Sequence, residues 1–445
     1  MKFLSILVAK TLIKLGNLIG KGSCFPGSVA LKIDKNILEK LNINSKIIAV
    51  TGSSGKGSTS SVIVNALTNL GHDVIYNYKG ANLNSGIATL LLENCDFKGN
   101  INSDYIVLEM DERYAKYVFG SVKPDYLVVT NITRDQPPRQ GNFDIVKDDI
   151  KKSIQDNTKL ILNGDDPYLR KLVKDLDNKA FYYSVDKNSS STTSSMFKNL
   201  NITRCPICNS KLIYDYYNFE HLGKYKCSKC DFSSPESFTR VTNIDFDANT
   251  ITLNEKYNIH LVSRLLFNVY NVVAAYTVLK LLGINENEIS NQVSKQLQNK
   301  KIYSQYKYKD RNVYTLNNKN ENATTFNQSL MFLNTYDCKK TIVVGWKEIS
   351  RRYKFNDISW LYDVDFEILK NHEIDKVICI GVQNYDIATR IYLAGIEANK
   401  IKTFETVKEG TDYIKGNTNG DIFAILNFDY VEPFNENMKG DVIKW

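Results

Sequence analysis

The segment VTGSSGKGSTS (50–60) places the strongest constraint on how this chain can fold. It follows the apolar run SKIIAVTG (45–52) and leads into a helical pattern, so we expect a buried strand, a tight loop and a helix. The glycines of a G-x-x-G-K loop, here Gly52 and Gly55, let the backbone close around phosphate oxygens, and the N–H groups at a helix start point toward an anion. Lys56 should then reach the β- and γ-phosphates. A generic glycine-rich turn is the alternative interpretation.

The loop departs from the strict phosphate-loop pattern at two positions. Val50 stands where that pattern has a glycine six residues before its lysine. Gly57 stands where a hydroxyl side chain normally binds Mg²⁺, and Ser58 and Thr59 follow it. We expect one of these two hydroxyls to complete the magnesium site, and the sequence leaves open which one.

Strand and helix patterns alternate through most of the 445 residues, a length that suits two or three domains. Apolar, β-branched runs recur between helical or polar stretches, as in a parallel sheet wrapped by helices. In the first part of the chain the runs cover 104–111, 124–132 and 159–166, and a long helical pattern covers 261–284. In the last part we expect strands at 340–346, 375–381, 400–405 and 421–428, and helices at 384–395 and 406–415.

These patterns predict an α/β chain of two larger domains with an insertion. An N-terminal amphipathic segment covers 1–44, a central P-loop domain 45–302, and a Rossmann-like C-terminal α/β domain 303–445. The Ser/Thr/Asn-rich stretch 186–199 predicts a loop or linker. A cysteine-rich insertion in the central domain follows it at 200–240.

Four of the eight cysteines have the spacing of a metal site. Cys205, Cys208, Cys227 and Cys230 form C-x2-C, 18 intervening residues and a second C-x2-C, which is typical of a zinc ribbon. In a reducing cytosol this pattern indicates metal before disulfides. Four thiolates complete a tetrahedron and leave no open position, so we expect a structural Zn²⁺. Two disulfides or unligated thiols are the alternatives.

Polar side chains stand at the ends of three expected strands. Glu109 could bind Mg²⁺ directly or through water, although an acid at a strand end is often only solvated. Asn131 and Asp135 follow the next strand, at the edge where α/β sheets bind ligands. Asp165 and Asp166 could reach a ribose or a metal, and a plain turn explains them equally well.

Charge and hydropathy exclude several classes of protein. Lysine and arginine number 57 against 49 acidic residues, and the net charge of +8 suits anionic substrates but is too weak to indicate nucleic-acid binding. No run reaches the roughly 18 apolar residues of a spanning helix. At the start (1–22), Lys10 and Lys14 interrupt a helical apolar pattern. We expect an amphipathic helix packed on a cytoplasmic protein, with membrane-surface contact and export as alternatives.

Several segments together resemble successive signatures of the Mur ligases, a family that includes folylpolyglutamate synthase-like enzymes. They are TGSSGKGST, the strand-end Glu109, TNITRDQ, LNGDDP and FNVYNVVAA. The four-cysteine ribbon, LIGKGSCFPGSVALKI and NDISWLYDVDFE (356–367) are similar to one branch, MurT, the synthetase subunits of lipid II isoglutaminyl synthase. The resemblance covers nearly the whole chain and implies a Mur ligase-like central P-loop ATPase domain.

The resemblance also implies a reaction. ATP would phosphorylate the α-carboxylate of D-glutamate in the lipid II stem peptide, and ammonia from a GatD-type glutaminase subunit would displace phosphate to give D-isoglutamine, in peptidoglycan biosynthesis. It assigns ATP binding to Gly52, Gly55, Lys56, Gly57, Ser58, Thr59, Asn268 and Asn271, and Mg²⁺ binding to Glu109. The two asparagines would lie on the helix that faces the adenine.

The sequence departs from the family in three more places. Gln136 stands where many Mur ligases have histidine, which fits the MurT branch but removes a metal ligand. PPRQGNFD (137–144) replaces a more usual acidic and tyrosine-bearing continuation, and GWKEISRRYKFND (345–357) replaces an asparagine- and glycine-rich approach to SWLYD. These departures affect individual contacts and leave the predicted class unchanged.

The chain has no evident source of ammonia of its own. None of its four histidines pairs with a cysteine in a convincing nucleophile setting, and Cys24, Cys95 and Cys379 fit core thiols. A partner subunit is therefore expected, and the resemblance assigns Asp357 to it: this carboxylate would orient the catalytic histidine of the glutaminase. Asp363 and Asp365 are nearby competitors, and a helix cap or solvated turn is the alternative for all three.

Two other functions remain open at this stage. An autonomous Mur-type ligase would need an amino-acid pocket in the last domain, and the segment before the phosphate loop is too short for a UDP-binding domain. A nucleic-acid-binding zinc-ribbon protein would bind DNA or RNA without nucleotide dependence and with strong salt sensitivity.

Overall fold

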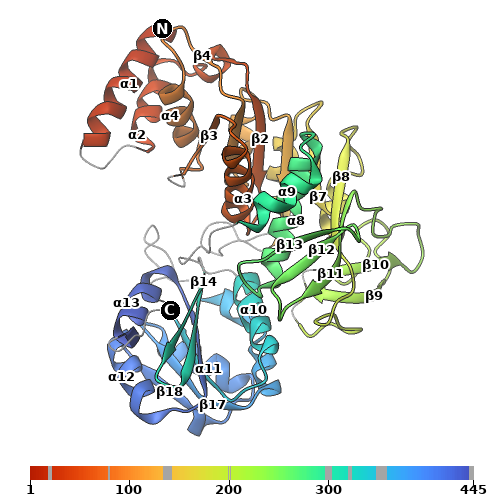
Figure 1. Cartoon of the computed structure of the whole chain (residues 1–445), viewed down its shortest axis with the longest axis vertical. Coiled ribbons are helices and arrows are strands. Elements are labelled where there is room, and N and C mark those ends of the chain that lie inside the picture. The colour runs from red at the N-terminus through yellow and green to blue at the C-terminus, as the bar shows by residue number, and fades with distance from the viewer. Residues whose placement is uncertain are drawn as a thin grey trace.

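Two α/β units, each built on one large sheet, make up the computed structural model, which describes residues 1–18, 23–78, 81–133, 143–198, 200, 202–295, 303–318, 323–346 and 358–439 (Figure 1). The first sheet has nine strands in the order β13-β12-β11-β8-β7-β6-β2-β5-β3. Its strands are β2 (Lys46–Thr51), β3 (Val74–Tyr76), β5 (Tyr105–Glu109), β6 (Tyr126–Val129), β7 (Lys159–Asn163), β8 (Ala180–Val185), β11 (Thr239–Asp245), β12 (Thr250–Leu253) and β13 (Tyr257–His260).

In this order, all neighbouring strands between β11 and β3 are parallel. Strands β12 and β13 extend the sheet beyond β11 with antiparallel pairing. Strands β2, β6 and β7 are almost completely buried, because helices cover both faces. One apolar core joins this sheet to α3 (Lys56–Asn69), α8 (Leu266–Leu281) and α9 (Glu286–Ser294). The opposite core includes α4 (Asn84–Asn94), α5 (Ala115–Val118), α6 (Phe143–Ser153) and α7 (Pro167–Leu172).

The N-terminal helices α1 (Lys2–Leu18) and α2 (Phe25–Ile33) pack against each other and against α4. Ile6 and Ala9 of α1 are buried in the same core as α4. A short turn η1 (Leu38–Lys40) and the parallel pair β1 (Asn42–Ile43) and β4 (Asn100–Ile101) connect this part to the sheet. No helix among the described residues is long and apolar enough to cross a membrane.

The cysteine-rich insertion forms an antiparallel hairpin of β9 (Leu212–Phe219) and β10 (Leu222–Cys227) beside the first sheet. A small separate core holds it together, and Tyr225 and Phe232 stack there with ring centroids 5.6 Å apart. Strand β11 follows it and already belongs to the large sheet.

The C-terminal unit has a six-stranded sheet in the order β14-β15-β19-β16-β17-β18, in which only β14 runs antiparallel to its neighbour. The strands are β14 (Tyr303–Tyr308), β15 (Arg311–Asn317), β16 (Lys340–Gly345), β17 (Ile374–Ile380), β18 (Ile401–Phe404) and β19 (Asp421–Leu426). The helices are α10 (Ala323–Phe332), α11 (Asn384–Leu393), α12 (Val407–Asn417) and α13 (Phe428–Met438), with short turns η3 (Leu333–Thr335), η4 (Ser359–Asp363), η5 (Phe366–Asn371) and η6 (Ala398–Lys400).

The predicted α/β fold is confirmed, and the expected strands and helices of both units are present. Features that were not predicted include β3 and β8, the strands between 239 and 260 that extend the first sheet, and the β14–β15 hairpin that opens the second. The helix expected over 261–284 is shorter, since α8 begins at Leu266 and ends at Leu281, before the left-handed Gly283 (φ +86°).

Candidate nucleotide site and cysteine cluster

The loop between β2 and α3 needs glycine at two positions. Gly52 has φ +128° and Gly55 has φ +83°, a region that side chains disfavour. A Cβ on Gly52 would come within 2.3 Å of Thr130 Oγ1, and one on Gly55 within 2.3 Å of Asn271 Oδ1. The loop therefore closes tightly against β6 and α8, and α3 begins directly at Lys56.

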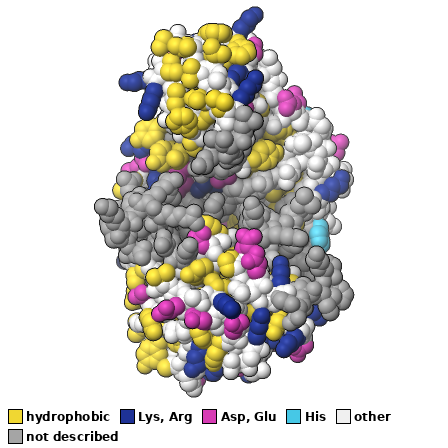
Figure 2. All heavy atoms as spheres, turned by 90° about the vertical axis from the view of Figure 1, so that its left-hand side faces the viewer, with side chains coloured by type: hydrophobic (Ala, Val, Ile, Leu, Met, Phe, Trp, Pro, Cys, Tyr) yellow, Lys and Arg dark blue, Asp and Glu magenta, His cyan; other side chains and the backbone are white. Residues whose placement is uncertain are grey.

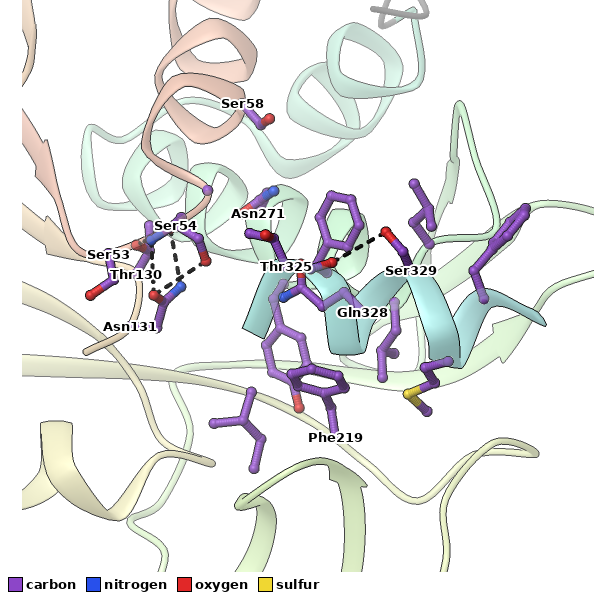
Figure 3. A pocket seen from close by; sticks show the side chains of 18 of the residues that line it. Ser53, Ser54, Ser58, Thr130, Asn131, Phe219, Asn271, Thr325, Gln328 and Ser329 are labelled. Atoms are coloured by element: carbon purple, nitrogen blue, oxygen red, sulfur yellow. Dashed lines mark hydrogen bonds between the residues drawn. The ribbon is translucent and has the colours of Figure 1, made fainter. Parts of the chain in front are cut away.

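The residues after β6 hold this loop in place. The Ser54 N–H donates to Asn131 Oδ1 at 3.0 Å, and Asn131 Nδ2 donates back to the Ser54 carbonyl at 3.0 Å. Thr130, which lies beside Ser54 and Asn131 in Figure 3, donates through Oγ1 to the same carbonyl at 2.6 Å. The Thr133 N–H donates to Ser53 Oγ at 2.9 Å. Asn131 thus acts here as a clamp on the loop.

Lys56 is folded back onto its own loop and onto a carboxylate. Its Nζ lies 2.9 Å from Glu112 Oε2 and donates to the carbonyls of Gly52 and Ser53. Burial alone would lower the pKa of this ammonium, but Glu112 and two further carboxylates outweigh burial and raise that pKa above its usual value. Lys56 stays charged, and it must leave Glu112 to reach a phosphate.

Three acidic side chains line the same wall, at and just after the end of β5. The backbone of Glu109 is held by Asn77, whose side chain accepts from the N–H and donates to the carbonyl, both at 2.9 Å. Asp111 pairs with Arg113 at 2.8 Å, and Glu112 with Lys56. A Cβ on Gly57 would lie 3.2 Å from Glu109 Oε2, so the missing hydroxyl residue leaves space beside this carboxylate.

The two candidate hydroxyls differ in accessibility. Ser58 lines the pocket, whereas Thr59 is buried and its Oγ1 lies 3.4 Å from Asn271 Oδ1. Oxygen ligands from Glu109 and Ser58, completed by waters, fit the chemistry of Mg²⁺. These are the residues that would hold the ion in this site.

Of the two asparagines expected near the adenine, Asn271 lies in the pocket wall. Its Oδ1 faces the phosphate loop, and its buried Nδ2 has no hydrogen-bond partner among the described residues. Such an amide suits a ligand acceptor. Asn268 is also buried with an unpartnered Nδ2, but it is not among the residues that line the pocket.

The pocket lies between the two α/β units and has a volume of about 1280 Å³. The phosphate loop and the acidic wall form one side, and α10 supplies Thr325, Gln328 and Ser329 from the other (Figure 3). Its lining includes Ser53, Ser54, Tyr76, Tyr78, Asn82, Asn163, Phe219, Leu222, Arg264, Phe267, Asn317, Asn318 and Phe428. A cavity of this size has room for a nucleotide and part of a second substrate.

The two acidic residues after β7, Asp165 and Asp166, make buried structural hydrogen bonds. Asp165 Oδ2 accepts from the Tyr270 hydroxyl at 2.8 Å and from the Val185 N–H at 2.9 Å, and burial raises the pKa of Asp165 to about 7. Asp166 caps α7 through the Tyr168 N–H. Both carboxylates are buried and neither lines the pocket.

Sequence reasoning missed the tip of the β9–β10 hairpin. Buried Glu220 accepts from Asn327 Nδ2 of α10 at 2.9 Å, and His221 Nε2 lies 3.5 Å from Asp166 Oδ1. Burial raises the pKa of Glu220. The tip therefore touches both α/β units. Glu112 was also missed, although the run of acids that ends β5 could have indicated it.

The four ribbon cysteines come together as predicted. Their sulfur atoms all lie within 4.8 Å of one another, with Cys205 and Cys230 3.7 Å apart and Cys208 and Cys227 3.4 Å apart. Four thiolates around a tetrahedral Zn²⁺ are about 3.8 Å apart, given Zn–S bonds of about 2.3 Å. Backbone N–H groups also point at the Cys205 and Cys227 sulfurs. The cluster therefore fits a closed structural zinc site.

Three aspartates named from the sequence need separate comment. Asp135 and Asp357 lie outside the described residues. Asp365 is buried, accepts from the Lys198 N–H at 3.0 Å and donates its own N–H to Asn327. Asp365 is therefore part of the packing around α10.

Comparison with known proteins agrees with this geometry. The Mur ligase middle domain family matches residues 50–279, and the MurT ligase C-terminal family matches residues 320–429. The MurT subunit of lipid II isoglutaminyl synthase (glutamine-hydrolyzing) from Staphylococcus aureus (strain COL) is 31% identical over 98% of this chain and 97% of its own. The same subunit from Streptococcus pneumoniae (strain ATCC BAA-255 / R6) is 29% identical over 86% of this chain and 85% of its own.

Solved structures show the same fold. A pseudomurein peptide ligase type C from Methanothermus fervidus has a TM-score of 0.68 at 18% identity, over 91% of this chain and 81% of its own. A MurF ligase from Thermotoga maritima in complex with ADP has a TM-score of 0.59 at 16% identity, over 92% of this chain and 84% of its own. With two family matches and relatives that align from end to end, this chain belongs to the MurT branch of the Mur ligase family.

Proposed function

We propose that this chain is the synthetase subunit of a two-subunit lipid II isoglutaminyl synthase. It would use ATP to activate the α-carboxylate of D-glutamate in the lipid II stem peptide, and ammonia from a GatD-type glutaminase to amidate it. The observation that carries this proposal is a large pocket that joins the phosphate loop and its acidic wall to α10 of the MurT-type C-terminal unit.

The phosphate loop would bind the triphosphate. The N–H groups at the start of α3 point toward an anion, and Lys56 carries a charge that can move from Glu112 to the γ-phosphate. Mg²⁺ held near Glu109 and Ser58 would neutralise the phosphate charge. The chain's own contribution is positioning and electrostatic stabilisation, because phosphoryl transfer needs no protein nucleophile.

The proposed reaction has two steps. A carboxylate oxygen of the substrate attacks the γ-phosphorus, the bond to the bridging oxygen breaks, and ADP leaves with an acyl phosphate formed. The nitrogen lone pair of ammonia then attacks the acyl carbon, phosphate leaves with the C–O bond electrons, and the nitrogen loses a proton. The amide and inorganic phosphate are the products.

Ammonia must reach the pocket unprotonated, which favours delivery from a partner. Two histidines of this chain are already paired with carboxylates, His72 with Asp104 and His221 with Asp166, each at 3.5 Å.

We propose that Asp357 orients the catalytic histidine of the partner subunit. Its conversion to Asn should leave ATP binding intact and suppress the partner's glutaminase activity; unchanged glutaminase activity would refute the assignment.

The function can be tested with the full chain, purified lipid II, ATP, glutamine and a co-purified GatD-type subunit. We expect amidated lipid II only with all components, and Lys56→Ala should abolish it while the complex still forms. Lys46→Ala, on the exposed start of β2, is the matched control and should keep activity. Full glutamine-dependent amidation by this chain alone would refute the two-subunit proposal, and incorporation of an amino acid would favour an autonomous ligase.

A further inference from the structure

The outer face of the N-terminal helices exposes many large apolar side chains. Between 40% and 72% of each is exposed, and they come from α1, from the start of α2 and from the loop after α4: Met1, Phe3, Leu4, Leu7, Leu15, Phe25 and Phe97. We call these residues the N-terminal apolar face. Figure 2 shows hydrophobic side chains gathered at this end of the molecule, with Lys or Arg side chains at the margin. Apolar groups gathered in this way mark an interaction surface.

Helix α1 is apolar on two sides, and only one of them is covered. Ile6, Ala9 and Ile13 are buried against the protein. Leu4, Leu7 and Leu15 lie on the opposite, exposed side at helical spacing. The buried side of α1 packs on α2 and α4, and nothing among the described residues covers its exposed apolar side. A helix of this kind needs a second apolar environment.

The two N-terminal helices that supply most of this face carry charges of one sign. Residues 1–33 contain five lysines and no acidic residue. Lys10 Nζ donates to the Glu93 carbonyl at 2.9 Å and lies 5.8 Å from the Phe97 ring, and Lys14 is exposed next to Leu15. The nearest acids in sequence to Phe97 are exposed Glu93 and Asp96, and the Asp96 carboxylate is occupied by the N–H groups of Lys98 and Asn100.

We propose that the N-terminal apolar face docks on the surface of an anionic lipid bilayer. Apolar side chains would enter the boundary between headgroups and acyl chains, and the flanking lysines would meet the negative headgroups. Large apolar side chains on helices that carry lysines and no acid fit a lipid surface better than a protein partner, whose interface would match charge with charge. The face also lies at the far end of the molecule from the C-terminal unit (Figure 1). The inference rests on this face alone and does not depend on the proposed reaction.

The test is co-sedimentation of the full chain, without nucleotide, with vesicles of phosphatidylcholine alone or mixed equally with phosphatidylglycerol. We expect binding to the mixed vesicles and at least a tenfold loss in Phe3→Ser/Leu7→Ser, since each side chain buries apolar area only in the bound state. Lys14→Gln should lose about fivefold on the mixed vesicles. Tyr392→Ser/Leu393→Ser, an equally exposed pair on α11, is the control and should bind like the original chain.

Because the substituted side chains are exposed, unchanged thermal unfolding can confirm that each variant is folded. Absence of binding to the mixed vesicles would overturn the inference, as would equal binding by Phe3→Ser/Leu7→Ser. Equal binding to neutral vesicles would overturn the role of the lysines. If that variant instead loses self-association or a protein partner while vesicle binding persists, the face is a protein interface and the proposal fails. Amidation assayed separately on detergent-solubilised lipid II distinguishes this outcome from failure of the proposed function.

Discussion

The ion pair between Lys56 and Glu112 should make nucleotide binding weaker than the phosphate loop alone would allow. The two side chains are 14% and 3% exposed, and their charged atoms lie 2.9 Å apart. Lys56 must give up this partner before it can bind a phosphate. Replacing Glu112 by Gln should therefore tighten ATP binding.

The size of the effect follows from the partners that Lys56 loses and keeps. A charge on one partner strengthens a hydrogen bond from about 0.5–1.5 to about 1.5–3 kcal/mol net, and Glu112→Gln removes one of the two charges from the pair while Lys56 stays charged. Glu112→Gln would thus reduce the cost of releasing Lys56 by about 1–2 kcal/mol, which corresponds to roughly 5–30-fold tighter binding. Loss of the ion pair between Lys56 and Glu112 should also lower the free energy of unfolding by a similar amount.

The assay is calorimetric titration of the full chain with a non-hydrolysable ATP analogue, with and without Mg²⁺. Asp111→Asn is a matched control, because it also removes one negative charge from the pocket wall but leaves the pair intact, since Asp111 binds Arg113. Both variants reduce repulsion of the triphosphate, and only Glu112→Gln releases Lys56. A double-mutant cycle with Lys56→Met isolates the coupling between the two residues.

Three results would refute this reasoning. One is weaker ATP binding in Glu112→Gln, which would make Glu112 a ligand of the nucleotide or its metal. Another is an equal gain in Asp111→Asn, which would reduce the effect to overall charge. The last is an unchanged effect of Glu112→Gln when Lys56 is Met.

Three further predictions concern stability and the ribbon. Because burial raises the pKa of Asp165 to about 7, the folded protein holds a proton that the unfolded chain releases near pH 4, so stability should fall from pH 4 to 7 by up to about 4 kcal/mol. Asp165→Asn should flatten this slope in thermal unfolding across that range, and an unchanged slope would place the titration elsewhere. Asn327→Ala removes the donor that lies 2.9 Å from buried Glu220, leaves it the Thr324 hydroxyl at 3.5 Å, and should lower the free energy of unfolding by about 1–3 kcal/mol in urea titrations; a change below 0.5 kcal/mol would contradict the buried contact. Chelation of Zn²⁺ should raise hydrogen exchange in residues 202–238, and exchange that stays low would mean that the hairpin is stable without metal.

Local patterns predicted the parts of the fold that depend on local physics. The strand–loop–helix of residues 45–69 follows from an apolar run, two glycines and a helical pattern that adjoin in sequence. The cysteine cluster follows from spacing alone, because two C-x2-C turns of a hairpin bring four sulfurs together. The strands β11 to β13 were missed because their sequences are short and rich in polar residues, and because their place in the sheet depends on pairing with distant β8.

The site was predicted less completely because its contacts join distant segments. Lys56 and Glu112 are 56 positions apart, and Gly55 meets Asn271 across 216 positions. The sequence indicated Glu109 as a candidate Mg²⁺ ligand at a strand end. It did not indicate the acidic residues that follow, because their direction depends on the turn after the strand. For Asp165 and Asp166 the sequence allowed either ligand binding or a purely structural turn. Their buried contacts with Tyr270 and His221 support the structural role.

The cysteine cluster and the pocket lie at opposite ends of one hairpin, which gives the ribbon a position in the proposed catalytic cycle. Cys227 ends β10 at the metal end, and Glu220 and His221 form the tip. The residues on either side of the tip, Phe219 and Leu222, line the pocket. Because the tip also contacts Asp166 of the first unit and Asn327 of α10, a hairpin made rigid by bound Zn²⁺ would help to fix the distance between the phosphate loop and the opposite pocket wall. A structural metal can therefore affect turnover while nucleotide affinity, which depends on the first unit, stays unchanged.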